Sequence, residues 1–594
     1  MASIDDLFRK PTTSPSSIST TNKRKFPDHT LSPAYKSAKI SANGTPHTPT
    51  IEDGDDTDIE AGPSLPPTET DNGAEEEEDD DEEGRFFGSG VSADARQALD
   101  YVEGAMAGGL GAGEEEVIDA AWLRRMAVGF ERRITRNAEL RARFEAEPEK
   151  FMTSEADLDA DIKGLSILSE HSELYAEFAK LGCVGSLVAL LAHENTDIAI
   201  DAIEVLGELT DEDVEADETQ WRALVDAMLD AGVIELLTQN LGRLDEDIES
   251  DRAGVYHVLA VVENLCSQQS IVEAMAVGND GLLRWLLGRI GQKEKRVGQN
   301  MRYAGEVLAI LLQSSPKTRR RFAEMDGLDA LLQILSVYRR KDPEKDSDEE
   351  EYVENLFDCL VCLVDESTGK EKFTEAEGVE LCLIMLREGK MSKSRALRVL
   401  DHAMGGSVGG GVCEQFVEAS GLKTIFGMFM KKQEREAIEH LLGIFSSLLR
   451  LLPGQSASRV RTLAKFMEKD FEKIQKLVDL RQEYTARMTN VGEAIRMEGE
   501  QLNPEERAAM ADEWLSRRLD AGLFSLQTVD VILSWLIAED DGARSRVEKL
   551  LKGRDESFEN LKQSLREQLD GIDAEQSSEQ AEAKDMLGTL LQCL

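Results

Sequence analysis

The segment GCVGSLVALLAH, which begins at Gly182, decides the fold because it recurs along the chain in altered form. Each copy is a glycine followed by an apolar stretch with helical spacing, and successive copies start 50, 49, 46, 51 and 43 residues apart. The later copies are Gly232 (GVIELLTQNLGR), Gly281 (GLLRWLLGRI), Gly327 (GLDALLQILSVY), Gly378 (GVELCLIMLREG) and Gly421 (GLKTIFGMFMKK).

A second apolar helix follows each copy. These helices contain VLGELT from Val205, VVENLC from Val261, VLAILL from Val307, LFDCLVCLV from Leu356, RVLDHAM from Arg398 and IFSSLLR from Ile444. No unit could bury its apolar faces alone, so the units must stack into one core. The glycine would let the chain turn sharply between the short helix and the long one. The period predicts an all-α, armadillo/HEAT-like, right-handed superhelical solenoid with helical caps at both ends.

Composition shifts divide the chain. We expect a disordered arm over residues 1–90, a helical cap over 91–181, about six armadillo repeats over 182–453 and a second helical cap over 454–594. Within the last part, residues 457–503 predict one long helix, residues 504–571 two or three more, and a short helix ends the chain. Lys341 to Glu351 and Gly405 to Gly411 are interpreted as surface loops.

The formal net charge of −48, from 116 Asp and Glu against 68 Lys and Arg, excludes general electrostatic attraction to nucleic acid or to anionic membranes. Local basic patches remain compatible with it. The seven cysteines are thinly spread within apolar runs, which is typical of reduced core thiols in an intracellular protein. Because the sequence shows neither a secretory signal nor an apolar run long enough for a membrane span, we expect a soluble protein of the cytosol or nucleus.

The N-terminal arm combines a basic cluster with an acidic run at Glu75 to Glu83. The cluster predicts a bipartite nuclear localisation signal that an import receptor binds, with a chance basic patch as the alternative. The acidic run is a solvating tail or folds back on basic surfaces. The signal consists of Lys23, Arg24, Lys25, Lys36 and Lys39, and the candidate phosphorylation sites beside it, each before a proline, are Ser14, Ser32, Thr45 and Thr48.

No constellation of side chains predicts catalysis, a metal or a cofactor, so we expect a protein that is not an enzyme. Cys359 and Cys362 form a CxxC, but they lie in an apolar stripe without a second pair and favour the core over zinc or redox chemistry. His402 has no cysteine or second histidine nearby, and the glycines at Gly409 to Gly411 lack the GK[ST] of a Walker loop.

In an armadillo stack the long helices line a concave groove, and here their polar faces carry acids and an amide. Aligned carboxylates suit an extended Lys/Arg-rich peptide, and the alternative is that these residues are only a solvated surface. The long helices quoted above contain no Trp, so binding would depend on charge and shape. The candidate groove residues are Glu204, Glu208 and Asp211, which share one helix face at i, i+4 and i+7, together with Glu263, Asn264, Glu306, Asp358 and Asp401.

Several blocks in one order resemble the beta-catenin-like protein 1 family over roughly residues 115–570. The blocks are FERRITRNAELRARFEAEPEKFMTSEADLD (from Phe130), HENTDIAIDAIEVLGELTD (from His193), NLFDCL (from Asn355), LREGKMSKSRALRVLDHAM (from Leu386) and RRLDAGLF (from Arg517).

This resemblance implies a nuclear, non-enzymatic scaffold in pre-mRNA splicing that associates with the nineteen complex. It implies binding of basic, nuclear-signal-like segments of splicing factors, notably of the Myb-repeat scaffold subunit of that complex. The alternative is a nuclear transport adaptor that carries basic-peptide cargo. We expect no direct sequence-specific nucleic-acid contact and no membrane contact, and a homo-oligomer stays open.

Overall fold

The computed structural model describes residues 117–278, 281–572 and 578–594, and in these residues all regular structure is helical. The predicted nuclear signal, the phosphorylation sites and the acidic run lie outside the described residues. Two helices precede the repeats, α3 (Ala120–Arg143) and α4 (Met152–Gly164). Short 3₁₀ turns connect the helices at η3 (Pro148–Lys150), η4 (Leu165–Glu170), η5 (Ser172–Leu174), η6 (Leu190–Ala192) and η7 (Ser336–Arg339).

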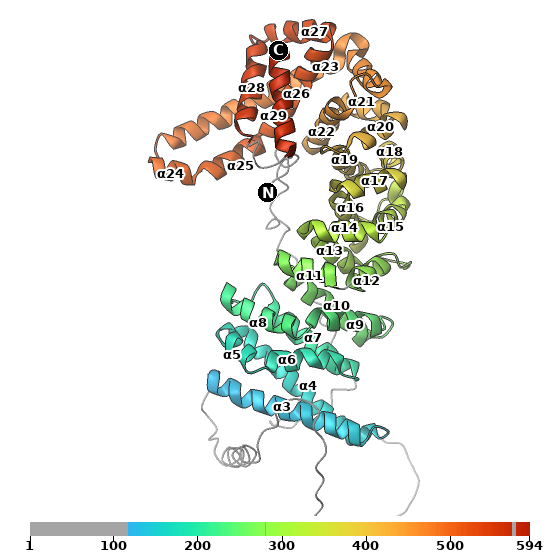
Figure 1. Cartoon of the computed structure of the whole chain (residues 1–594), viewed down its shortest axis with the longest axis vertical. Coiled ribbons are helices and arrows are strands. Elements are labelled where there is room, and N and C mark those ends of the chain that lie inside the picture. The colour runs from blue at the N-terminus through green and yellow to red at the C-terminus, as the bar shows by residue number, and fades with distance from the viewer. Residues whose placement is uncertain (1–116, 279–280, 573–577) are drawn as a thin grey trace, which may run out of the picture. The chain divides into compact units, whose positions relative to one another are not determined.

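Three helices make up each repeat, as expected for an armadillo protein (Figure 1). The first helices are α5 (Tyr175–Lys180), α8 (Glu218–Asp230), α11 (Gln269–Gly278), α14 (Pro316–Glu324), α17 (Ser367–Glu375) and α20 (Gly410–Glu418). The second helices are α6 (Cys183–Ala189), α9 (Val233–Arg243), α12 (Gly281–Ile290), α15 (Gly327–Leu335), α18 (Gly378–Glu388) and α21 (Gly421–Phe429). The third helices are α7 (Thr196–Thr210), α10 (Glu249–Leu265), α13 (Gln299–Ser314), α16 (Asp348–Asp365), α19 (Met391–Met404) and α22 (Arg435–Leu451).

The third helices form a continuous ladder in which each one contacts the next, from α4 through α7, α10, α13, α16 and α19 to α22. Their apolar faces are almost fully buried, and together with the first and second helices they form one hydrophobic core. Burial of this kind stabilises each repeat only through its neighbours, which is the energetic basis of a solenoid. The all-α armadillo architecture predicted from the period is therefore confirmed.

The repeating glycine has two different roles. In each of the first two repeats, a glycine with left-handed backbone follows a buried side chain by four positions. Gly182 (φ 81°) follows Phe178, and Gly232 (φ 74°) follows Met228. Glycine adopts this conformation without the steric cost of a Cβ, so the predicted role in a sharp turn is correct here.

In three later repeats the left-handed residue, again four positions after a buried Phe, is not glycine. Its φ is 59°, 56° or 65°, and the glycine comes one position later as the first residue of the second helix. A Cβ on that glycine would lie 2.3–2.4 Å from the Phe ring. The prediction of a turning glycine is wrong at these sites, because the glycine makes room for a ring. The three sets are Phe322, Asp326 and Gly327; Phe373, Glu377 and Gly378; and Phe416, Ser420 and Gly421.

The two predicted surface loops differ from expectation. Lys341 to Glu351 is a loop only at its start, because Ser347 caps the N-terminus of α16 and the acidic residues after it form the first helical turn. Gly405 to Gly411 is a tight connection that is exposed at Ser407 and Val408 but buried at Gly405, Gly406 and Gly409, where a Cβ on Gly409 would lie 2.3 Å from the carbonyl oxygen of Met404. Close approach of the backbone accounts for Gly409, and a left-handed backbone with φ 71° accounts for Gly406.

The C-terminal helices are α23 (Ala457–Gly499), α24 (Pro504–Ala509), α25 (Ala511–Ala521), α26 (Leu523–Glu539), α27 (Asp541–Lys552), α28 (Phe558–Asp570) and α29 (Ser578–Cys593). The predicted single helix over 457–503 is broken, because residues 468–471 leave the helical conformation and three of them have positive φ. Residues 504–571 form five helices instead of two or three. The last helix is 16 residues long, so it is not a short one.

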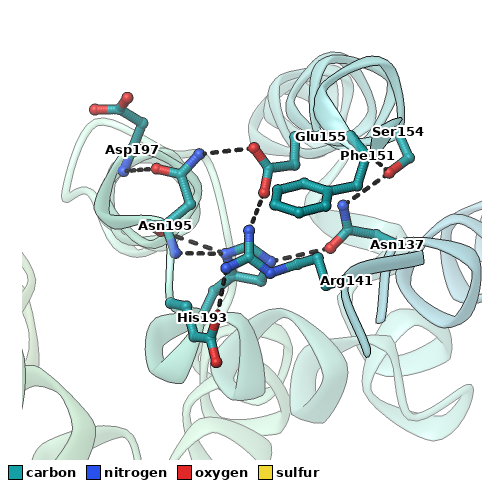
Figure 2. Close-up of polar contacts among 9 residues, drawn as sticks. Asn137, Arg141, Phe151, Ser154, Glu155, His193, Asn195 and Asp197 are labelled. Carbon is teal, nitrogen blue, oxygen red and sulfur yellow. Dashed lines mark hydrogen bonds and ion pairs between the residues drawn. The ribbon is translucent and has the colours of Figure 1, made fainter. Parts of the chain in front are cut away.

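A polar network joins α3 and α4 to the loop before α7 (Figure 2). Arg141 of α3 pairs with Glu155 of α4 and with Glu194, and its guanidinium carbon lies 4.7 Å from the centre of the Phe151 ring. A charged group held between two carboxylates and a ring face is fixed in orientation. This arginine therefore ties the N-terminal helices to the first repeat.

His193 lies at the centre of the same network. Its Nδ1 accepts a hydrogen bond from the backbone N–H of Asn195 at 3.1 Å, so the proton of the neutral ring is on Nε2, 3.1 Å from Oδ1 of Asn137. Asn137 in turn donates to the hydroxyl of Ser154 at 3.0 Å. The chain of hydrogen bonds is complete only when the imidazole is neutral. Burial lowers the pKa of His193 from its usual value.

The lowered pKa predicts a loss of stability in mild acid. As pH falls below about 6.5 the unfolded state gains a proton on this histidine before the folded state does, so the free energy of unfolding decreases with falling pH. The slope should be a fraction of the roughly 1.4 kcal/mol per pH unit that one whole proton gives, because the ring is partly exposed.

Urea unfolding between pH 7.5 and 5.5 measures this effect as the difference between the wild type and a His193→Gln variant. The variant should have the flatter dependence on pH. Equal slopes in the two proteins would show that His193 is not responsible.

Candidate functional site: the polar strip of the third helices

We call the solvent-facing side of the third helices the polar strip, and it consists of their half-buried and exposed side chains. Seven of the eight predicted groove residues lie on these helices: Glu204 and Glu208 on α7, Glu263 and Asn264 on α10, Glu306 on α13, Asp358 on α16 and Asp401 on α19. Asp211 does not, because α7 ends at Thr210 and Asp211 follows it with extended backbone. The spacing i, i+4, i+7 therefore describes one helix face only for Glu204 and Glu208.

Two strip residues on α10 are used to join neighbouring repeats. The side-chain amide of Asn264 donates to the backbone carbonyl of Gly207 at 3.1 Å and lies 3.2 Å from the hydroxyl of Thr210. Glu263 accepts a hydrogen bond from the phenol of Tyr303 on α13. The predicted role of Asn264 in pairing with a peptide backbone is thus in competition with a contact inside the molecule.

In the C-terminal half of the strip, four acids each contact a basic side chain from the next third helix. Arg398 of α19 donates to Asp358 of α16 at 2.7 Å, and Arg395 pairs with Glu354. Imidazole nitrogens lie at the carboxylates of the next pairs along, at 3.0–3.1 Å, for His440 with Asp401 and for His402 with Asp365. These contacts join successive third helices, so the carboxylates are already engaged inside the molecule.

The N-terminal half of the strip has an excess of negative charge, and we call Glu204, Glu208, Glu263 and Glu306 the acidic patch. The Glu204 side chain is 42% exposed, with an oxygen 3.8 Å from Nε2 of His257 on α10. Burial lowers the pKa of His257, against the opposing effect of Glu204 and Glu208, so the ring is neutral at pH 7 and does not cancel their charge. Glu208 is exposed, while Glu263 and Glu306 are partly buried and take part in other polar contacts.

Two tyrosines beside the acidic patch were not among the predicted residues. Tyr256 of α10 and Tyr303 of α13 have ring centres 5.0 Å apart, and burial, followed by the charge of Glu263, raises the pKa of Tyr303 well above its usual range. Tyrosine faces attract lysine and arginine side chains. Their separation of 47 residues, one repeat, was the signal that could have identified them.

Within the described residues no three His, Cys, Asp or Glu side chains are grouped so that they could hold a metal ion. Cys359 and Cys362 lie in the core of α16, and burial raises the pKa of the Cys362 thiol to about 12. Their predicted place in an apolar stripe is confirmed. Taking each described helix alone, none is both long and apolar enough to cross a membrane, although two bent helix pairs meet the length and composition criteria together.

The chain is similar to one known protein family, to several of its members and to solved armadillo structures. Residues 96–566 match the family described as catenin-beta-like, Arm-motif containing nuclear. The chain is 37% identical over 503 residues to a beta-catenin-like protein 1 homolog from Schizosaccharomyces pombe, covering 84% of this chain and 87% of that protein. It is 40% identical over 492 residues to human beta-catenin-like protein 1, with 80% and 86% covered. Among solved structures, a designed armadillo repeat protein is similar with a TM-score of 0.34 and 13% identity, covering 45% of this chain and 99% of that one.

Proposed function

Because this chain belongs to the catenin-beta-like family of nuclear armadillo-motif proteins, we propose that it is a non-enzymatic scaffold in pre-mRNA splicing. Its acidic patch binds basic, nuclear-signal-like segments of splicing factors. The partners are proteins of the nineteen complex, notably its Myb-repeat scaffold subunit, and an import receptor binds the N-terminal basic cluster. The protein acts without a cofactor.

The observation that carries the proposal is the pair of exposed glutamates on α7, Glu204 and Glu208, beside a histidine that is neutral at pH 7. Glu204 and Glu208 lie one helical turn apart and face the same side, so one extended peptide can place a lysine or arginine at each. Guanidinium groups form paired hydrogen bonds with carboxylates, which favours arginine at these positions. Tyr256, which is partly buried and packs against the buried Tyr303, supplies a ring face for an aliphatic stem next to it.

Charge reversal of the two exposed glutamates tests the site. A Glu204→Lys/Glu208→Lys variant should bind an eight-residue Lys/Arg peptide at least tenfold more weakly than the wild type at 100 mM salt, because two attractive contacts become repulsive. Fluorescence anisotropy of the labelled peptide gives the dissociation constants, and wild-type affinity should decrease steeply as salt rises.

The matched control is Asp226→Lys/Asp230→Lys, which makes the same change of net charge at exposed positions of α8. This control should lose less than threefold in affinity. If both variants lose affinity equally, the peptide is held by the net charge of the protein and not by the acidic patch.

The wider role is tested by affinity purification from nuclear extract followed by mass spectrometry. A splicing scaffold should recover splicing factors together with small nuclear RNAs. A transport adaptor should instead shuttle between nucleus and cytosol and release its cargo when a nuclear GTPase binds.

A further inference from the structure

The helix α3 is strongly basic in an otherwise acidic protein. It carries seven arginines, two glutamates and no lysine. Three of the arginines hold α3 to the helices beneath it: Arg124 pairs with Glu177, Arg133 with Asp161, and Arg141 with Glu155. Their charges are therefore matched inside the molecule.

The other four arginines lie along the opposite side of α3. The first of the four is Arg125, and the other three follow it after 7, 11 and 18 residues. These spacings are close to whole numbers of helical turns, so all four share one face. The buried face of the helix, formed by Leu123, Ala127 and Phe130, is on the other side. This arginine face extends for roughly 27 Å along the helix, and its members are Arg125, Arg132, Arg136 and Arg143.

The arginine face is accessible to a ligand. Arg125, Arg136 and Arg143 are exposed and Arg132 is partly buried, and Arg125 and Arg132 also take part in other polar contacts. The guanidinium carbon of Arg143 lies 5.5 Å from the centre of the Phe144 ring at the end of the helix. Among the described helices, α3 packs chiefly on α4 and α6, which lie on its buried side (Figure 1).

We propose that the arginine face of α3 binds the phosphate backbone of single-stranded RNA without sequence preference. All basic residues of α3 are arginines, which favours RNA over an acidic protein segment as the ligand. A guanidinium group can donate two hydrogen bonds to a phosphate and can also stack on an unpaired base. An acidic segment would be bound as well by lysine. This inference does not depend on the acidic patch, which lies on other helices.

The net charge of the protein shapes how this contact works. At long range the whole molecule repels RNA, so binding depends on short-range contacts and is strongest where RNA is already held nearby by a partner. A scaffold with an acidic patch for basic proteins and an arginine face for RNA can thus bring the two kinds of ligand together. The acidic patch also repels RNA, and the arginine face repels basic peptides.

The test uses the full chain and a fluorescein-labelled oligouridine of 20 nucleotides. Binding is followed by anisotropy between 50 and 200 mM salt. With phosphate contacts at Arg136 and Arg143, the slope of log affinity against log salt should be about −1.4, a decrease on the order of sevenfold over this range. An Arg136→Glu/Arg143→Glu variant should bind at least tenfold more weakly at 50 mM salt and should lose most of the salt dependence.

Two further variants make the outcome specific. Lys423→Glu/Arg461→Glu changes the same charge at exposed positions of α21 and α23 and should change affinity less than threefold. The Arg136→Lys/Arg143→Lys variant keeps the positive charge. It should bind RNA more tightly than the Glu variant but more weakly than the wild type, because lysine lacks the planar guanidinium group.

Absence of RNA binding by the wild type at 50 mM salt would overturn the proposal, as would an equal loss of affinity in the control variant. A polyglutamate peptide of matched charge serves as competitor. If it displaces the RNA at a lower concentration than unlabelled oligouridine does, the face binds acidic protein and the RNA assignment is wrong.

Discussion

An Arg481→Met variant is expected to lose about 3–5 kcal/mol of stability in the C-terminal helices. Arg481 of α23 donates to Asp530 of α26 at 2.6 Å and pairs with Glu556 before α28. Asp530 is fully buried, and one of its carboxylate oxygens has no hydrogen-bond partner in the described structure. Removal of the arginine would leave a buried carboxylate without its neighbouring cation.

The pKa of Asp530 gives this prediction a pH signature. Burial raises that pKa to about 6 even with Arg481 beside it. A carboxyl group with a raised folded pKa binds its proton more tightly in the folded state, so between the unfolded value and the folded one stability rises as pH falls. The defect of Arg481→Met should therefore be largest above pH 7 and smaller at pH 5.

Hydrogen exchange of the α26 amides, measured at both pH values, reports the free energy of local opening. Arg481→Met/Asp530→Leu should recover most of the loss, because it replaces the pair by apolar groups. Arg487→Met is the control, since this exposed arginine pairs with Glu483 one turn away and should cost less than about 1 kcal/mol. A defect in Arg481→Met that the second substitution does not relieve would argue against the buried-charge explanation.

A Gly378→Ala variant should lose about 3 kcal/mol. The new Cβ would lie 2.4 Å from atoms of the Phe373 ring and 2.8 Å from the Phe373 carbonyl oxygen. The ring is fully buried and cannot move aside without disturbing the core between α17 and α18. The same substitution elsewhere in a helix normally stabilises, so the sign of the effect is diagnostic.

Gly129→Ala is the matched control because Gly129 is in the interior of α3 and a Cβ there would meet no atom within 4 Å. This variant should gain roughly 0.5–1 kcal/mol. Thermal unfolding of the two variants and the wild type separates the effects. If Gly378→Ala is neutral, the ring contact does not explain why glycine recurs at this position.

The repeat could be predicted from the sequence because its signal is local and repeated. A glycine followed by an apolar helix needs no knowledge of partners, and the same pattern, Gly522 before a long apolar run, marks the start of α26. The break in α23 could not be found in this way. Lys469, Asp470 and Phe471 have left-handed backbone although none is glycine, so tertiary packing overrides their preference.

The acidic patch was harder to predict than the fold because it is defined by pairing between helices. Glu204 and Asp358 look alike in sequence, yet Asp358 has an arginine from the next repeat at 2.7 Å and Glu204 has a neutral histidine. Which acid meets a cation depends on how far one helix is displaced along the next. That displacement is not encoded in the period of 43 to 51 residues.

The ladder of third helices has a mechanical consequence for recognition. Each third helix contacts the next one, so small rotations at successive interfaces add up along the stack. A peptide across α7, α10 and α13 would span two of these interfaces and could be accommodated by small adjustments at both. Such compliance would let the proposed acidic patch fit basic segments whose side chains differ in spacing, and a bound segment would in turn stiffen the portion of the stack that it crosses.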